Sequence, residues 1–207
     1  MIAIVDYGMA NLRSVEKALL MAGGDPVISS DPAVISKADK VVLPGVGAFC
    51  AAMENLNRSG LRDSVVSAIQ SGRPFLGICL GLQMLFTSST EMGSSNGMGV
   101  MDGEVVRFFE DEKPAEANDL KVPHIGWNTI SPVCHSKLLN GVRDGDRVYF
   151  VHSYYPKPRD RDVVSATCDY GIDFCCAVER GNVAATQFHP EKSGAVGLRI
   201  LRNFVCW

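Results

Sequence analysis

A chain of 207 residues, 46% of them hydrophobic, is long enough to bury a sizeable core, and we expect residues 1–207 to form a single domain. The formal net charge is −3 and no long run of Lys and Arg occurs, which argues against nucleic acid or an anionic membrane as a partner. Seven cysteines without a C-x-x-C pair fit neither a disulfide framework nor a zinc site, so we expect no metal, no cofactor and a reducing, cytoplasmic compartment.

Strand-like and helical segments alternate through about the first 100 residues. "MIAIVDYG" predicts a first core strand and not a signal peptide, and no segment approaches the ~20 apolar residues of a membrane span. This alternation favours an α/β fold with an open, mostly parallel twisted sheet flanked by helices on both faces. The expected strands are 2–6, 26–29, 40–43 and 74–78, and the expected helices are about 12–22, 48–58, 62–71 and 80–88.

From about residue 100 the pattern changes to short strands separated by Gly, Asp and Pro turns. We expect these strands to be antiparallel additions to the same sheet. The acidic, proline-containing stretch 110–119 predicts a mobile surface loop, and Leu198, Leu201 and Val205 mark a closing amphipathic helix. The strand segments are "GEVVRFF", "RVYFVHSYY", "VVSATCDYG", "DFCCAVERG" and "VAATQFH".

Cys79 stands between two glycines in "LGICLGLQ", where a predicted strand meets a predicted helix. An isolated cysteine beside Leu and Ile is most often a small core residue. Here, however, G-x-C-x-G is the thiol form of the G-x-S-x-G nucleophile elbow, in which small neighbours let a side chain rise out of a sharp turn. The helix N-terminus also favours a thiolate. We therefore interpret Cys79 as a nucleophile, provided that a base lies elsewhere in the chain.

His189 is the candidate base, in "AATQFHPEKSG" directly after a strand. Pro190 disfavours helix at the preceding residue and holds it extended, so that Glu191 points to the same side as His189. Glu191 then orients one ring nitrogen and leaves the other to take the Cys79 proton. Alone, H-P-E also describes a turn histidine beside an unrelated surface glutamate. Combined with the elbow, it predicts a catalytic triad.

A third segment, "VVLPGVGAF", carries an expected strand into a glycine-rich turn. Reactive groups of open sheets gather beyond the carboxyl ends of the strands. Backbone N–H groups of Val46 and Gly47, with that of Leu80, would then form an oxyanion hole. The same P-G-x-G pattern also describes an ordinary strand-to-helix turn.

The motifs P-G-V-G, G-x-C-x-G-x-Q and H-P-E, in this order over nearly the whole chain, resemble the class I (triad) glutamine amidotransferases. The resemblance implies their flavodoxin-like three-layer fold and the hydrolysis of L-glutamine to glutamate and ammonia through a thioester on Cys79. It also implies that Gln83 and Glu91, with the backbone around Ser153 and Tyr154, hold the amino and carboxylate groups of glutamine. From the sequence alone, Gln83 and Glu91 are equally well solvated helix-end residues.

Within this family, "DYGMANLRSV", "VPHIGWN", "YFVHSYY" and "QFHPEKSG" resemble the glutaminase subunits of imidazole glycerol phosphate synthases, from histidine biosynthesis. That resemblance implies a heterodimer with a cyclase subunit, a (β/α)8 barrel that uses the ammonia to make imidazole glycerol phosphate and AICAR. The candidate docking residues are His124, Trp127, Tyr149 and Lys192. For Trp127, packing in the core is the alternative.

Three other functions remain open from the sequence. The chain is alternatively the glutaminase of another biosynthetic complex, such as anthranilate or pyridoxal phosphate synthase, which the identity of a co-purifying partner would reveal. A catalytically silent homologue that serves as a binding module is disfavoured because all three triad residues are present. A cysteine peptidase would act on peptides without needing glutamine.

Overall fold

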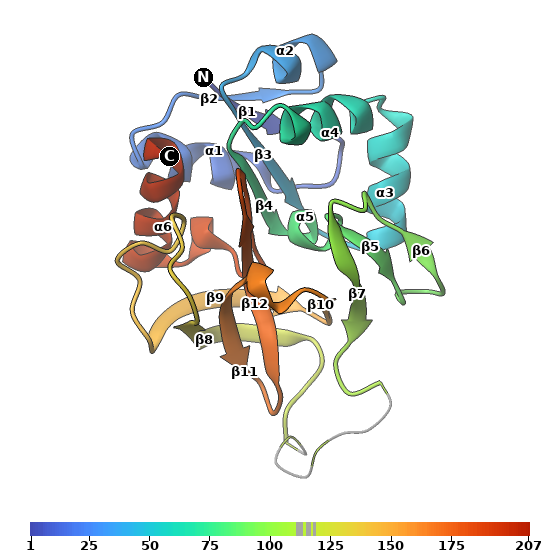
Figure 1. Cartoon of the computed structure of the whole chain (residues 1–207), viewed down its shortest axis with the longest axis vertical. Helices are drawn as coiled ribbons and strands as arrows, with labels where there is room; N and C mark the ends of the chain where they lie inside the picture. Colours follow the sequence, from blue (N-terminus) through green and yellow to red (C-terminus); the bar gives the residue numbers. More distant parts are fainter. Residues whose placement is uncertain (111–113, 115–116, 118) are drawn as a thin grey trace.

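Alternating strands and helices in the first half of the chain build the parallel part of a sheet. The computed structural model describes residues 1–110, 114, 117 and 119–207. Parallel strands follow one another in the order β2-β1-β3-β4-β13, the order of flavodoxin-like sheets (Figure 1). The predicted open parallel sheet is therefore confirmed. Its strands are β1 (Ile2–Val5), β2 (Pro26–Ser29), β3 (Lys40–Gly45), β4 (Phe75–Cys79) and β13 (Val183–Thr186).

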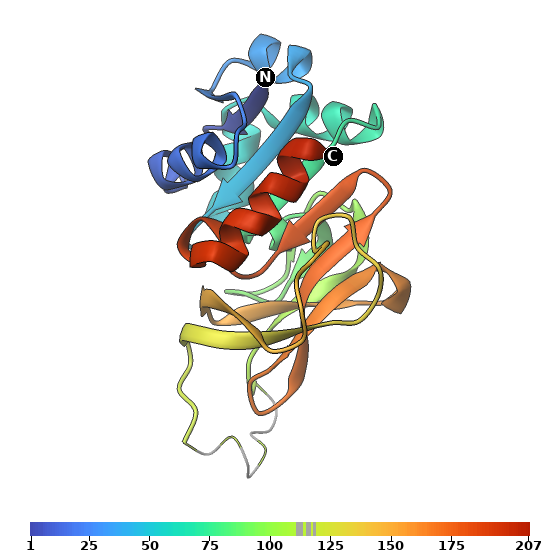
Figure 2. The same ribbon diagram turned by 90° about the vertical axis from the view of Figure 1, so that its left-hand side faces the viewer.

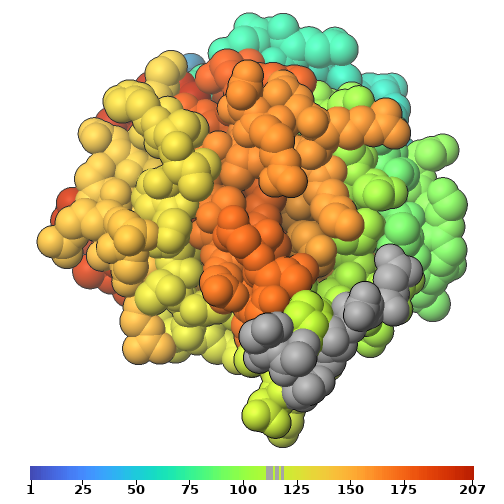
Figure 3. Space-filling model, turned by 60° about the horizontal axis from the view of Figure 1, so that its bottom comes forward, coloured from blue at the N-terminus to red at the C-terminus, as the bar shows by residue number. Residues whose placement is uncertain are grey.

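Antiparallel strands continue this sheet beyond β13 to a total of nine, in the order β12-β11-β8-β9. The predicted antiparallel additions are confirmed for these strands. Figure 3 shows the yellow and orange parts of the chain, in which these strands lie, side by side on one face. One detail differs: β13 pairs parallel with β4, and only its other edge, toward β12, is antiparallel. These strands are β8 (His124–Pro132), β9 (Asp146–His152), β11 (Val164–Asp169) and β12 (Asp173–Arg180).

A second, four-stranded sheet corrects the expectation that all later strands join the first one. Its order is β10-β7-β5-β6. The segment "GEVVRFF" lies mostly in β7, and "RVYFVHSYY" divides at Ser153 between β9 of the large sheet and β10 of the small one. Phe108 donates its backbone N–H to the Ser153 carbonyl at 3.0 Å, where the chain changes sheets. The strands are β5 (Phe86–Ser89), β6 (Ser95–Asn96), β7 (Met101–Arg107) and β10 (Tyr154–Pro158).

Helices cover both faces of the parallel strands and give the expected three layers (Figures 1 and 2). Along β1, Ala3 and Val5 face the core under α2, α3 and α4, whereas Ile2 and Ile4 face the core under α1 and α6. This alternation follows from the two-residue period of a strand. The helices are α1 (Leu12–Met21), α2 (Pro32–Lys37), α3 (Phe49–Arg58), α4 (Arg62–Gln70), α5 (Leu80–Gln83) and α6 (Gly194–Cys206).

The predicted helix over 80–88 is wrong beyond Gln83. The Met84 carbonyl accepts the Met98 N–H at 2.8 Å, and the Leu85 carbonyl accepts the Val100 N–H at 2.8 Å. These long-range bonds replace the next helical turn, and the chain enters β5. The apolar spacing of this segment does not distinguish a continued helix from the observed turn into β5, because both conformations bury these side chains.

Two further expectations concern mobility and membranes. Most of the predicted mobile loop at 110–119 lies outside the described residues. None of the helices in the described part of the chain is long and apolar enough to span a bilayer.

Candidate active site

The turn that carries Cys79 is strained, and its neighbours must be glycines. Cys79 is the last residue of β4 and has a positive φ of 55° and ψ of −106°, a backbone conformation that costs a non-glycine residue free energy. A Cβ atom on Gly81 would lie 1.9 Å from the Leu43 carbonyl oxygen, and one on Gly77 would lie 2.7 Å from that of Gly81. The flanking glycines thus let β3 and β4 approach the turn closely enough to hold Cys79 in this conformation, as in a nucleophile elbow.

His189 and Glu191 form a buried pair behind the cysteine. The His189 Nδ1 atom lies 2.8 Å from the Glu191 Oε1 atom, and the two side chains are 3% and 2% exposed. His189 is extended as expected, but Pro190 begins a 3-10 turn, η3 (Pro190–Lys192), so the turn and not a continued extended chain brings the two side chains together. The Lys192 N–H closes this turn on the His189 carbonyl at 3.0 Å.

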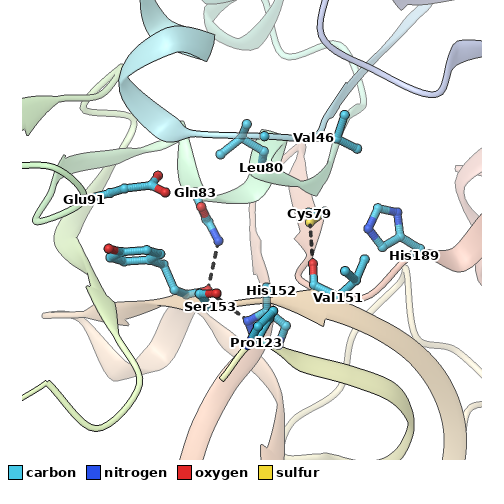
Figure 4. A pocket seen from close by; sticks show the side chains of 12 residues that line it. Val46, Cys79, Leu80, Gln83, Glu91, Pro123, Val151, His152, Ser153 and His189 are labelled. Carbon is cyan, nitrogen blue, oxygen red and sulfur yellow. Dashed lines mark hydrogen bonds between the residues drawn. The ribbon is translucent and has the colours of Figure 1, made fainter. Parts of the chain in front are cut away.

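The electrostatic environment of His189 favours its protonated form. Burial opposes a charge on the ring, but the adjacent Cys79 and Glu191 side chains outweigh burial and raise the pKa of His189 to about 10. Among the described residues, its Nε2 atom has no hydrogen-bond partner, and Figure 4 shows the ring beside Cys79. An imidazolium in this position stabilises a neighbouring thiolate. Because α5 is short, we expect the helix dipole that the sequence suggested to contribute less.

The cavity in front of Cys79 brings the predicted site residues together. Its volume is about 350 Å³, within the usual range for small-molecule sites. Every predicted catalytic, oxyanion and glutamine-binding residue lines it except Glu191, which lies behind His189. In the described residues, no group of three or more His, Cys, Asp or Glu side chains is arranged to hold a metal. The predicted residues that line the cavity are Val46, Gly47, Cys79, Leu80, Gln83, Glu91, Ser153, Tyr154 and His189.

The oxyanion candidates are in place, but one N–H group points elsewhere. The Val46 N–H donates to the Met9 carbonyl at 3.0 Å, so it is not available to a substrate oxygen in this conformation. Gly47 has a φ of +97°, which suits a glycine. Leu80 is the first residue of α5, where a helix leaves its N–H groups without intrahelical partners.

The glutamine-binding candidates are held by hydrogen bonds from neighbouring elements. Gln83 donates from Nε2 to the Tyr154 carbonyl at 3.0 Å, and it is 5% exposed, which excludes the solvated alternative. Glu91 accepts the Phe49 N–H at 2.6 Å and so lies at the start of α3.

Sequence reasoning missed Gln187, a fully buried residue two positions before His189. Its Nε2 atom donates to the Cys79 sulfur at 3.6 Å, and its Oε1 atom accepts from Gln83 Nε2 at 3.1 Å. A polar residue within the apolar strand end "VAATQFH" is the signal that points to it. Gln187 thus connects the candidate nucleophile Cys79 with the glutamine-binding candidate Gln83.

Three of the four docking candidates form one cluster near η3. Trp127 is 47% exposed and its ring centroid lies 6.2 Å from that of Tyr149, while the Lys192 Nζ atom lies 5.7 Å from the Tyr149 ring centroid. Core packing is therefore excluded for Trp127. His124 is a correction, because its side chain is 3% exposed and stacks inside the sheet instead of reaching the surface.

Known proteins match both this sequence and this fold. The family described as glutamine amidotransferase class-I matches residues 3–206. The chain belongs to this family. This amidotransferase is 54% identical to imidazole glycerol phosphate synthase subunit HisH of Geobacter metallireducens, over 98% of this chain and 96% of that protein. It is also 54% identical to subunit HisH of Syntrophotalea carbinolica, over 99% of this chain and 98% of that protein.

A solved structure shares the fold at much lower sequence identity. A chain of PurLQS from Thermotoga maritima matches this amidotransferase with a TM-score of 0.74 and 17% identity, over 99% of this chain and 97% of that chain. The arrangement of strands and helices is therefore retained where most side chains differ.

Proposed function

We propose that this chain is the glutaminase subunit of an imidazole glycerol phosphate synthase, which hydrolyses L-glutamine and passes ammonia to a cyclase subunit in histidine biosynthesis. The observation that carries this proposal is the strained elbow of Cys79, which stands beside the buried His189–Glu191 pair in one cavity. The identity of 54% to HisH subunits over nearly the whole chain supports the choice of pathway.

The reaction begins with the Cys79 thiolate and a protonated His189. The sulfur attacks the side-chain amide carbon of glutamine and forms a tetrahedral oxyanion. His189 then donates its proton to the departing nitrogen, which leaves as ammonia, and a thioester remains on Cys79. A water molecule that loses its proton to His189 attacks the thioester, and glutamate and the thiolate are released. Glu191 keeps the imidazole in the required orientation and stabilises its charge.

One hydrogen-bond donor for the oxyanion is available in the present conformation, and a second requires a change of the backbone. We assign the Leu80 N–H at the start of α5 as the standing donor. A second donor requires the peptides around Val46 and Gly47 to rotate, since the Val46 N–H donates to the Met9 carbonyl in the present conformation. The isolated subunit is therefore expected to be a poor glutaminase until a partner reorients this turn.

Substrate contacts follow from the remaining cavity wall. Gln83, Glu91 and the backbone at Ser153 and Tyr154 would hold the amino and carboxylate groups of glutamine, leaving its amide over Cys79. Glu91 suits the ammonium group because it carries the opposite charge.

The partner is a cyclase subunit, which we expect to be a (β/α)8 barrel that docks on the cluster of Trp127, Tyr149 and Lys192. Exposed aromatic residues next to a cation are typical of the centre of a protein interface. We further propose that the chain forms one domain and works in the cytoplasm. All seven cysteines lie in the described residues and are free, as expected for a reducing compartment.

The decisive test separates glutamine hydrolysis from the use of ammonia. In the reconstituted complex, Cys79→Ala should abolish synthesis from glutamine and leave synthesis from added ammonium salt unchanged. Cys50→Ala, which alters a partly exposed cysteine on α3, is the matched control and should keep both activities. Loss of both activities in Cys79→Ala would count against the division of roles. Activity restored only by the partner of another biosynthetic complex would redirect the pathway assignment.

A further inference from the structure

Two buried histidines lie in a chain of hydrogen bonds that begins at the cavity wall, which His152 itself lines. The His152 Nδ1 atom lies 2.9 Å from the Tyr154 carbonyl oxygen, and its Nε2 atom lies 3.1 Å from His124 Nδ1. The His124 Nε2 atom lies 3.4 Å from Asn128 Nδ2. His152 and His124 are only 6% and 3% exposed, so water does not compete for these contacts.

The Tyr154 carbonyl and the Asn128 amide, at the two ends of this series of hydrogen bonds, allow only one arrangement of the protons on the two imidazole rings. A carbonyl oxygen only accepts, so His152 carries its proton on Nδ1 and accepts at Nε2. His124 must then donate from Nδ1 and accept from the Asn128 amide at Nε2. The Asn128 amide is oriented independently, because its Oδ1 accepts the Thr129 N–H at 2.8 Å and its Nδ2 donates to the Asp169 carbonyl at 2.9 Å. A second proton on either ring would set two donors against each other.

The surroundings of both rings agree with this neutral arrangement. His124 stacks on Tyr170 and Phe150, with ring centroids 3.9 and 4.6 Å away, and Phe108 lies 5.2 Å from His152. Burial among these rings lowers the pKa of His124 to about 4 and that of His152 to about 3. Both imidazoles are therefore neutral at physiological pH.

The acceptor at the inner end of this series of hydrogen bonds is a backbone carbonyl that has two donors. It belongs to Tyr154, directly after Ser153, where the backbone leaves β9 of the large sheet for β10 of the small one. Tyr154 opens β10 and pairs with Arg107 of β7, while Ser153 before it belongs to neither strand. The Tyr154 carbonyl accepts from His152 on one side and from Gln83 on the other, as Figure 4 shows. Ser153 and Tyr154 both line the cavity.

We propose that His152 and His124 are positioning residues for glutamine binding: as neutral Nδ1–H tautomers, they fix the Tyr154 carbonyl and thereby the Ser153–Tyr154 backbone that meets the substrate. This inference rests on the proposed function. His152 acts directly on the carbonyl, and His124 holds His152 in the tautomer that donates. Neither ring exchanges a proton with the substrate, in contrast to His189.

The proton arrangement is tested on the wild-type chain by NMR of ¹⁵N-labelled histidine side chains at neutral pH. Two of the four histidines should be locked in the Nδ1–H form, and variants assign them to 124 and 152. An Nε2–H tautomer, or a charged ring, at either position overturns the inference.

Glutamine kinetics of the complex with the cyclase test the positioning role. His152→Leu removes one of the two donors to the Tyr154 carbonyl, and we expect KM for glutamine to rise about tenfold with kcat changed less than about threefold, since Gln83 alone then holds this carbonyl. His152→Asn keeps an N–H near the Nδ1 position, and KM should stay within about threefold of wild type. A merely structural role would lower the amount of active enzyme, and hence the apparent kcat, without changing KM.

Each outcome bears on the inference. Unchanged KM in His152→Leu, or equal KM values for the Leu and Asn variants, overturns it. If His152→Leu does not fold, His124→Leu takes its place beside His124→Asn, which keeps the donor to His152, and the same KM comparison applies. A wild-type complex without glutamine-dependent activity would instead overturn the proposed function and leave the tautomer measurement to decide the inference.

Discussion

The parallel and antiparallel halves of the sheet contribute different parts of the cavity. The parallel half provides the candidate reacting groups, since Cys79 ends a parallel strand and the Val46–Gly47 turn and His189 each follow one. The antiparallel half provides Ser153 and Tyr154, at a change of sheets. Glycines that permit close backbone approach hold the Cys79 turn, whereas hydrogen bonds from the buried His152 and Gln83 side chains hold the Tyr154 carbonyl. Reactivity and substrate recognition therefore depend on different physical features.

The largest effect is expected from a substitution in the parallel half at Gly81, where the backbone of α5 approaches that of β3 most closely. Gly81→Ala would place a Cβ atom 1.9 Å from the Leu43 carbonyl oxygen, and we expect a loss of about 3 kcal/mol in the free energy of unfolding. The rate at which an electrophilic glutamine analogue labels Cys79 should fall about 10²-fold, because the elbow is distorted.

Gly72→Ala is the matched control for this substitution. Gly72, unlike Gly81, has a positive φ, +79°, and no atom lies within 4 Å of the added Cβ position. Only backbone strain of about 1–2 kcal/mol should appear, with labelling at Cys79 and not at the other cysteines. Urea denaturation and peptide mapping measure both effects, and equal losses in the two variants would contradict the steric explanation.

A second prediction concerns the turn between β3 and α3. Binding of the cyclase with its nucleotide ligand should raise kcat for glutamine hydrolysis about 10²–10³-fold with a smaller change in KM, because an oxyanion donor acts mainly in the transition state. Gly47→Val should reduce this activation without preventing complex formation, since Gly47 has a φ of +97° beside the Met9 side chain.

The control for the turn is Gly60→Val, which carries a similar backbone strain with no atom within 4 Å of the Cβ position. It should retain full activation. Equal kcat values for the free subunit, the binary complex and the liganded complex would remove the case for a partner-controlled oxyanion hole.

Removing the orienting carboxylate should have a smaller effect. Glu191→Ala leaves the thiol and imidazole in place, and we expect kcat to fall about 10–100-fold, less than in Cys79→Ala, because triad members contribute unequally. Loss of the 2.8 Å contact should also lower the pKa of His189. Lys192→Ala, on the same turn, should bind the cyclase more weakly but keep kcat in the saturated complex. An unchanged kcat in Glu191→Ala would show that the carboxylate assignment is wrong.

The smallest effect is an acid sensitivity of the antiparallel half. The pKa values of His124 and His152, about 4 and about 3, lie below the ~6.5 of an unfolded histidine, so the unfolded chain binds more protons and stability falls as pH decreases below ~6.5. His189 has the opposite sign. Its raised pKa stabilises the fold fully below pH ~6.5 and loses this effect as pH rises toward 10.

We expect each of the two neutral histidines to lower the free energy of unfolding by about 1–2 kcal/mol as pH falls from 6.5 to 5. Urea unfolding at the two pH values measures this loss. His152→Asn should make the loss smaller, whereas substitution of the exposed His135 by Gln should leave it as in wild type. If His152→Asn loses as much unfolding free energy at low pH as wild type, His152 is not one of the acid-sensitive groups.

The same division explains what could be predicted from the sequence. The strands of the parallel half have continuous apolar runs and glycine turns, which are local signals, so its order and the elbow at Cys79 were accessible. The break at Ser153 was not, because it depends on Phe108 and β7, which pair across many residues. For the same reason, "HIGWN" gives no sign that His124 points inward, and nothing local in "VHSYY" connects His152 to His124.

The position of β13 in the middle of the sheet has a consequence for how the chain acquires activity. Val183 pairs beside Phe75, so the ordered sheet can close only after a long intervening segment has found its place, and such non-local pairing slows folding. His189 and Glu191 follow β13 directly. During synthesis, the nucleophile emerges from the ribosome well before its base and the strand that positions it. An incomplete chain therefore carries Cys79 without His189 and Glu191, and we expect it to hydrolyse no glutamine until folding is finished.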